Sequence, residues 1–118
     1  MKEVKNEKEL DEILKSPSKT VIFYFWSMCP HCQVMHEPYD QLEKDHGDVK
    51  FVKVESKNIP KKLKKSAFPE FELRQNKRVK RSVGGEMSKE ELDKKLFGRV
   101  GGRSRTRRLS RRVRKRTN

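Results

Sequence analysis

The chain contains two cysteines, Cys29 and Cys32, three positions apart. Two thiols at this spacing can exchange disulfides with another molecule, close a structural disulfide, or ligate a metal. They follow an apolar run at residues 20–26 and precede apolar residues at helical spacing, so we expect them where a strand meets the start of a helix. A helix N-terminus has free N–H groups and a partial positive charge, and both stabilise a thiolate. This position favours disulfide exchange, with Cys29 as the attacking thiol.

The residues next to Cys29 suit the same chemistry. Pro30 fits the first helical position, because the N–H that it lacks would have no partner there. His31 can donate to, or pair with, the Cys29 thiolate and so stabilise the reduced form. Cys32, one turn into the helix, is expected to be less exposed and to act as the resolving thiol, which displaces the substrate from its mixed disulfide with Cys29.

Two other uses of the cysteine pair have less support. Cys29, Cys32 and His36 have acceptable spacing for zinc ligands. The fourth ligand would have to be His31 or His46, because the chain has no second pair of cysteines. A structural disulfide that closes so short a loop constrains the unfolded chain little. We therefore expect neither a metal nor another cofactor, and we expect His36 and His46 to be solvated.

The composition divides the chain into two parts. Of its 118 residues, 31% are hydrophobic and 41% are charged, which suffices for one modest core. Residues 98–118 hold ten Lys or Arg and no acid, and so carry +10 of the formal net charge of +14. That segment has too few apolar residues to offset the entropy of ordering it. We predict a compact domain at 1–97 and a basic, disordered tail at 98–118.

The tail is a candidate site for nucleic acid or another polyanion, since its charges can neutralise phosphates. It has no aromatic residue to stack on bases, which argues against sequence-specific recognition of single strands. A nuclear import signal, a kinase site at Ser110, or a solvated end that aids solubility are the alternatives. The candidate anion-binding residues are Arg103, Arg105, Arg107, Arg108, Arg111, Arg112, Arg114, Lys115 and Arg116.

Strand and helix patterns alternate along residues 1–97. The run at 20–26 has no polar alternation, so it is expected to be a central strand covered on both faces. The other predicted elements are an edge strand at 2–5, a helix at 7–15 capped by Asn6, a helix at 30–46 kinked at Pro38, a strand at 48–55, a hairpin at 68–83 that turns at Asn76 and Lys77, and a helix after Ser88 that ends at Gly98.

This order resembles the thioredoxin family over about residues 1–97. Four stretches carry the resemblance: FWSMCPHC after the apolar strand, Pro69 in AFPEF at the place of the family's cis-proline, the QNKRV turn, and VGGEMSKEEL before the last helix. The resemblance implies an α/β fold of the thioredoxin type, with a central mixed sheet of four to five strands and helices on both faces. The arginine-rich tail also fits a virus-encoded member.

The resemblance also implies a surface for protein substrates. A cis bond before Pro69 lets the backbone of Phe68 approach the cysteines and pair with an extended substrate. Trp26, Met28 and Gly84 are the other candidate substrate contacts.

The sequence departs from the family at two positions. Phe23 stands six residues before Cys29, where thioredoxins and isomerases carry a buried acid that is thought to take the proton of the resolving thiol. Met28 replaces the tryptophan that precedes the first cysteine. The Pro-His dipeptide resembles that of oxidising members, and its His that of isomerases, so we predict a potential above the roughly −270 mV of thioredoxin, toward the roughly −180 mV of isomerases.

We therefore expect a monomeric thiol-disulfide oxidoreductase that acts on protein disulfides or dithiols, with thioredoxin reductase or glutathione as its electron partner. A glutaredoxin-like enzyme is the nearest alternative, since Gly84 and Gly85 beside Glu86 resemble glutathione-binding relatives. A binding protein that acts through its basic tail is a second alternative. The charged start lacks the apolar run of a signal peptide, and no run of 18 apolar residues occurs. These features predict a cytoplasmic protein, with the nucleus or a virion as alternatives.

Overall fold

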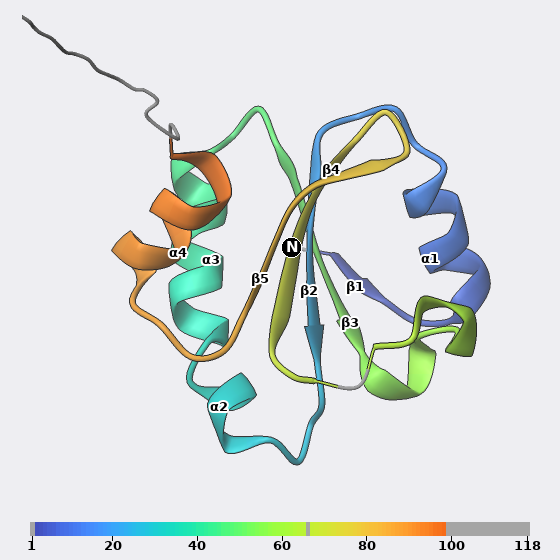
Figure 1. The fold of residues 1–118 in the computed structure, drawn as a ribbon, viewed down its shortest axis with the longest axis horizontal. Coiled ribbons are helices and arrows are strands. Elements are labelled where there is room, and N and C mark those ends of the chain that lie inside the picture. The colour runs from blue at the N-terminus through green and yellow to red at the C-terminus, as the bar shows by residue number, and fades with distance from the viewer. Residues whose placement is uncertain (1, 66, 99–118) are drawn as a thin grey trace, which may run out of the picture.

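A five-stranded sheet with helices on both faces forms the domain (Figure 1). The computed structural model describes residues 2–65 and 67–98. The elements are β1 (Lys2–Val4), α1 (Glu7–Leu14), β2 (Thr20–Phe25), α2 (Pro30–Gln33), α3 (His36–Asp45), β3 (Lys50–Glu55), two 3₁₀ turns (Ser56–Asn58 and Lys61–Leu63), β4 (Glu70–Gln75), β5 (Arg78–Gly84) and α4 (Lys89–Phe97).

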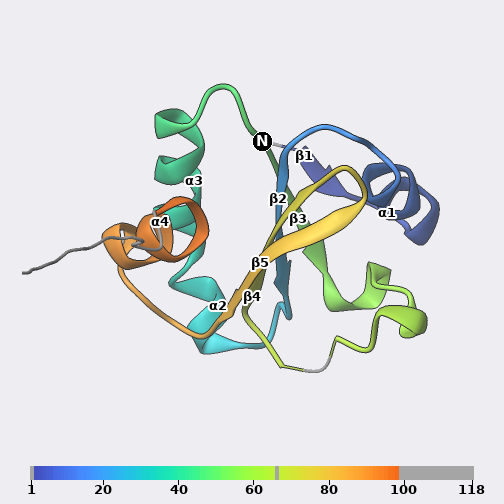
Figure 2. The same ribbon diagram turned by 45° about the horizontal axis from the view of Figure 1, so that its top comes forward.

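The strands lie in the order β1-β3-β2-β4-β5. β1 and β2 run parallel to β3, whereas β4 is antiparallel to β2 and β5 is antiparallel to β4. Helix α1 covers one face, and α3 and α4 lie side by side on the other (Figures 1 and 2). The predicted mixed sheet with helices on both faces is confirmed.

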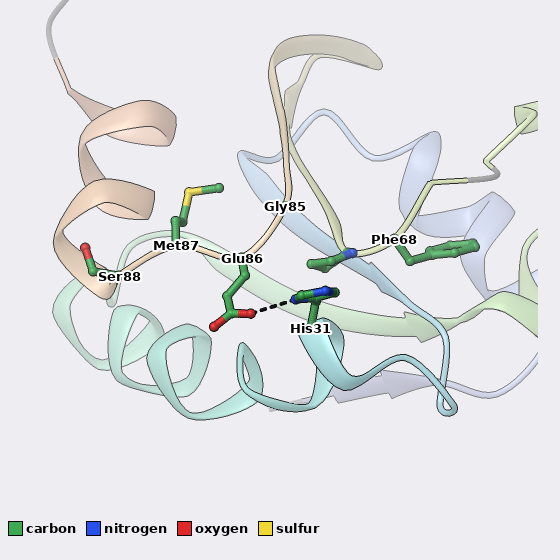
Figure 3. Close-up of a pocket in the computed structure, with 7 residues that line it drawn as sticks. His31, Phe68, Gly85, Glu86, Met87 and Ser88 are labelled. Atoms are coloured by element: carbon green, nitrogen blue, oxygen red, sulfur yellow. Dashed lines mark hydrogen bonds and ion pairs between the residues drawn. The ribbon is translucent and has the colours of Figure 1, made fainter.

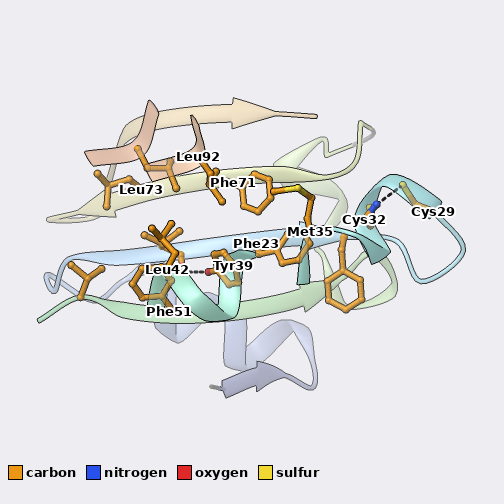
Figure 4. Close-up of a cluster of buried hydrophobic side chains, with 14 residues drawn as sticks. Phe23, Cys29, Cys32, Met35, Tyr39, Leu42, Phe51, Phe71, Leu73 and Leu92 are labelled. Atoms are coloured by element: carbon orange, nitrogen blue, oxygen red, sulfur yellow. Dashed lines mark hydrogen bonds between the residues drawn. The ribbon is translucent and has the colours of Figure 1, made fainter. Parts of the chain in front are cut away.

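Strand β2 lies at the centre of the sheet and is buried along its whole length. Its side chains alternate between two apolar clusters. Val21, Phe23 and Phe25 pack beneath α3 and α4, and Ile22 and Tyr24 pack beneath α1. Figure 4 shows Phe23 within the first of these clusters. Burial on both faces explains why this strand has no polar alternation in the sequence. It also makes β2 a rigid support for the loop that follows it.

The second helix differs from the prediction of one kinked helix over 30–46. The chain forms two helices, α2 and α3, with an interruption at residues 34–35. Pro38 lies in the first turn of α3, where the N–H that it lacks needs no helical partner. A continuous helix would have set the Pro38 ring against the carbonyl of Val34, four residues earlier. The interruption removes that clash.

The predicted turn and helix caps are confirmed. Asn76 and Lys77 form the turn between β4 and β5, with φ of 55° and 67°. The Asn6 side chain caps α1 and the Ser88 side chain caps α4. Each accepts a backbone N–H three residues further on, at 2.8 and 3.1 Å. These contacts depend on neighbours in the sequence, so the sequence predicts them well.

Of the predicted tail at 98–118, only Gly98, where α4 ends, lies within the described residues. The domain boundary and the anion-binding residues of the tail therefore stay predictions. Within residues 2–65 and 67–98, no helix has the length and apolar content needed to cross a membrane.

Candidate active site

Cys29 and Cys32 lie at the junction of β2 and α2. Cys29 is the N-cap residue of α2, with an extended backbone (φ −92°, ψ 114°). Its Sγ accepts the backbone N–H of Cys32 at 3.3 Å (Figure 4). An N–H donor aimed at this sulfur stabilises the negative charge that it carries as a thiolate. Both cysteines are free thiols in the structure.

The two thiols differ in exposure. Cys32 is fully buried, whereas 7% of Cys29 is exposed. Burial, with a smaller contribution from its hydrogen bond with Cys29, raises the pKa of Cys32 to about 12. Cys29 is therefore the thiol that an incoming molecule reaches first. Cys32 is protonated at neutral pH and needs a base before it can attack.

The Phe68–Pro69 segment faces Cys29 from the start of β4. The peptide bond between these two residues is cis. The Phe68 carbonyl oxygen lies 3.8 Å from Cys29 Sγ. Strands β2 and β4 are antiparallel neighbours, with Tyr24 opposite Glu70, so the end of β2 and the start of β4 meet at one edge of the sheet. This pairing brings together two segments that are about 40 residues apart in the sequence.

The glycines after β5 support the Phe68–Pro69 segment. The N–H of Gly85 donates to the Pro69 carbonyl at 3.0 Å. Gly85 has a φ of 98°, a conformation that other residues seldom adopt. Gly84 sits beside the same carbonyl, since a Cβ at this position would lie 3.5 Å from the Pro69 oxygen. Gly84 thus borders the predicted substrate edge without blocking it.

An open cavity of about 710 Å³ lies next to this edge (Figure 3). Glu86 reaches into it from the segment between β5 and α4 and meets His31 of α2. The His31 Nδ1 and Glu86 Oε1 atoms are 2.7 Å apart, and both side chains are at least half exposed. The cavity is lined by His31, Phe68, Pro69, Gly85, Glu86, Met87 and Ser88.

The sequence did not predict that His31 bonds to Glu86. That His31 acts on the Cys29 thiolate stays a prediction, and the hydrogen bond that the structure shows for His31 is with Glu86. The two residues are 55 positions apart, so no spacing pattern signals their contact.

Three large apolar side chains are exposed around the cysteines. Trp26, Met28 and Val34 are 48%, 70% and 52% exposed. Trp26 and Met28 come from the loop before Cys29, and the Trp26 carbonyl accepts the Cys29 N–H at 3.0 Å. Trp26 and Met28 are predicted substrate contacts, and Val34 is an addition from the structure. None of the three lines the cavity, so they add exposed apolar surface outside it.

Phe23 occupies the position where a buried acid was expected from the family. It is fully buried, and its ring stacks on that of Phe71 with centroids 4.7 Å apart. The rings of His36 and Tyr39 also pack against it, each at 5.1 Å. Cys32 belongs to the same buried cluster. Phe23 therefore adds apolar surface to the cluster that contains the resolving thiol, and it offers no group that accepts the proton of that thiol.

His36 and His46, which we expected to be solvated, are partly buried. His36 Nδ1 lies 3.0 Å from Lys53 Nζ, and burial together with the Lys53 charge lowers the pKa of His36. The His46 ring stacks on Phe97 at 4.0 Å, and its Nε2 lies 3.0 Å from Asp93 Oδ1. The predictions were wrong because these partners come from β3 and α4, far away in the sequence. Within the described ranges, no three His, Cys, Asp or Glu side chains form a group that could hold a metal ion.

Comparison with known families identifies this arrangement. The family model Thioredoxin matches residues 1–97. The chain belongs to the thioredoxin family. Thioredoxin from Plasmodium falciparum superposes with a TM-score of 0.72 at 20% identity, over 80% of this chain and 94% of that one. Mitochondrial thioredoxin 3 from Saccharomyces cerevisiae has a TM-score of 0.69 at 25% identity, over 80% and 91%.

A curated thioredoxin from Mycoplasmoides gallisepticum (strain R(low / passage 15 / clone 2)) matches a shorter stretch. It is 31% identical to this chain over 55 residues, which are 47% of this chain and 55% of that protein. The chain thus spans about half the length of the curated relative that it matches. The family match accounts for the fold, and the chemistry depends on the residues of this chain.

Proposed function

We propose that this thioredoxin-family chain is a thiol-disulfide oxidoreductase of protein substrates. The observation that supports this most directly is the position of Cys29 Sγ. It accepts an N–H at the start of α2, and it lies 3.8 Å from the Phe68 carbonyl beside a cis-proline. The nucleophile therefore sits next to the backbone of Phe68 and Pro69, which precedes β4 and lines the open cavity, so that an extended peptide can pair with this backbone.

The reaction takes place in two exchanges. The Cys29 thiolate attacks one sulfur of a substrate disulfide, which forms a mixed disulfide and releases the first substrate sulfur as a thiolate. Cys32 then loses its proton, and its thiolate attacks Cys29 Sγ. This step forms the Cys29–Cys32 disulfide and releases the second substrate sulfur. Run in reverse, the same steps oxidise a substrate dithiol.

Substrate binding combines backbone pairing with apolar contacts. Phe68 and Pro69 supply the edge for an extended substrate, and Gly84 leaves room beside it. The exposed border of Trp26 and Met28 buries apolar side chains of the substrate. Residues that flank a substrate cysteine would thus set affinity more than the disulfide itself does.

The potential is set by how well the reduced form is stabilised. Both the Cys32 N–H and a charged His31 favour a thiolate at Cys29, and every gain for the reduced form raises the potential. We therefore propose a potential above that of thioredoxin, and we propose thioredoxin reductase or glutathione as the source of electrons.

The test is the equilibrium of the full-length chain with a series of glutathione buffers, read by mass after thiol trapping. Thioredoxin with a Gly-Pro dipeptide is the reference, and Cys32→Ser is the control that cannot close the disulfide. We expect a Cys29–Cys32 disulfide with a potential near about −180 mV. A value near about −270 mV would refute the role of His31 and leave an ordinary thioredoxin. A chain that forms no such disulfide would refute the oxidoreductase proposal.

A further inference from the structure

The hydrogen bond between His31 and Glu86 joins the catalytic motif to the segment before α4. His31 is the second helical residue of α2, between the two cysteines, and Glu86 follows β5. Their Nδ1 and Oε1 atoms lie 2.7 Å apart across the cavity (Figure 3). Among the described residues that line this cavity, His31 and Glu86 are the two ionisable ones. The pair therefore faces the space that a substrate bound at Phe68–Pro69 would enter.

The segment that carries Glu86 is anchored on both sides. On one side, the N–H of Gly85 donates to the Pro69 carbonyl at 3.0 Å. On the other, the N–H of Met87 points at Met35 Sδ at 3.4 Å, and Ser88 caps α4. Glu86 is thus fixed between the cis-proline segment and the helix that follows the cysteines. A side chain held this way can orient a partner, whereas one on a free loop cannot.

A carboxylate partner decides which nitrogen of the imidazole carries the proton. An ionised carboxylate only accepts hydrogen bonds, so the His31 Nδ1 that contacts Glu86 must be the protonated one. Nε2 is then the nitrogen left free to exchange protons with sulfur. An acid that orients an imidazole in this way is also found in enzymes that activate a serine or cysteine.

We propose that Glu86 is a positioning residue for His31. It fixes the ring across the cavity with Nδ1 protonated, so that Nε2 donates and regains the proton used in disulfide exchange at Cys29. This inference rests on the proposed function. When Cys29 attacks, a Cys29–sulfur bond forms and the substrate S–S bond breaks. The departing thiolate takes the proton from Nε2 of the imidazolium, which leaves neutral His31 with its Nδ1–H on Glu86. Solvent then restores the proton, because His31 is exposed.

The negative charge of Glu86 also stabilises the imidazolium. In the free chain this effect is small, because both side chains are at least half exposed and water screens them. A peptide over the cavity excludes that water and strengthens the interaction. Glu86 therefore stabilises the reduced form through His31, and its loss lowers the potential.

The first test is a double-mutant cycle in the full-length chain. We expect Glu86→Gln to shift the equilibrium constant with glutathione by about two- to fivefold toward the disulfide form, the size of a half-exposed ion pair. Glu90→Gln is the matched control, because it removes the same charge from an exposed position in α4 nearby. It should shift the constant by less. In a His31→Ala background, Glu86→Gln should have no effect. An equal shift with and without His31 would overturn the proposal.

The second test measures the protonation of the His31 ring directly and does not depend on redox activity. Two-dimensional ¹⁵N–¹H spectra of the imidazole report which nitrogen is protonated. We expect a protonated Nδ1 in neutral His31 of the native chain and the Nε2-protonated form in Glu86→Ala. A protonated Nε2 with an unprotonated Nδ1 in the native chain would overturn the proposal. If the spectra agree but Cys29 and Cys32 form no disulfide, the contact stands and the proposed function is what fails.

Discussion

The resolving step should be slow at neutral pH and should accelerate steeply as the pH rises. Burial, with a further contribution from Cys29, raises the pKa of Cys32 to about 12. Burial is the larger cause and persists in the mixed disulfide, where Cys29 no longer carries a charge. Phe23 offers no carboxylate to take the proton. The concentration of Cys32 thiolate should therefore govern the rate.

The magnitude follows from this pKa. At pH 7.5, about one Cys32 in thirty thousand is a thiolate, against about one in ten for an ordinary cysteine of pKa about 8.5. A thiolate of higher pKa is the better nucleophile, with a Brønsted coefficient of about 0.4–0.5. The reactivity of each Cys32 thiolate is therefore about forty times higher, which offsets part of the loss. The net loss is roughly eightyfold in rate. The rate of the resolving step must increase with pH, because the thiolate fraction of Cys32 rises about tenfold per pH unit at all values well below its pKa.

The assay is the reaction with an aromatic disulfide that releases a coloured thiolate. Attack by Cys29 releases the first equivalent, and attack by Cys32 on the mixed disulfide releases the second. Cys32→Ser is the matched control and should release only the first. We expect the rate of the second phase to rise about tenfold per unit between about pH 7 and pH 9. A second phase that is independent of pH, or that levels off near neutrality, would show that an internal base takes the proton and would refute this reasoning.

Three further changes test the packing. Glu72→Gln should lower the free energy of unfolding at pH 7 by about 3 kcal/mol, because it removes the carboxylate that pairs with the largely buried Arg74 and leaves Lys65 with Glu70 as its charged partner, as urea unfolding would show. Burial alone would raise the pKa of Glu72, but the hydrogen bonds from Lys65 and Tyr24 keep it below its usual value. The stabilisation by ionised Glu72 is therefore present above the pKa of this group in the unfolded chain, and it is lost as the pH falls through the pKa in the folded chain. The native chain and Glu72→Gln should thus have similar stabilities in acid. Lys77→Gly should stabilise the chain by about 0.5–1 kcal/mol, because its φ is 67°, and a lower melting temperature would contradict this. Tyr39→Phe should cost about 1 kcal/mol through the lost 2.7 Å hydrogen bond to the Val52 carbonyl, and unchanged stability would show that this bond contributes nothing.

Local rules were enough for much of the fold. The apolar run of β2 predicted burial on both faces, and the turn at Asn76 and the caps at Asn6 and Ser88 were predicted from neighbouring residues. Each of these features depends on contacts within a few positions, or on a period that the sequence displays. The helix break at 34–35 was missed, because a proline in the first turn of a helix and one in its interior look alike in a sequence.

The candidate site shows the same difference between features set by neighbouring residues and features set by distant ones. The spacing of Cys29 and Cys32 and the strand before them were enough to predict thiol chemistry at a helix start. The surroundings of the two thiols are visible only in the folded chain: the Phe68 carbonyl beside Cys29, the burial of Cys32, and the pairing of His31 with Glu86. Spacing along the chain fixes what a few consecutive residues can do. Contacts over 39 and 55 positions depend on the order and pairing of the strands, which no local pattern encodes.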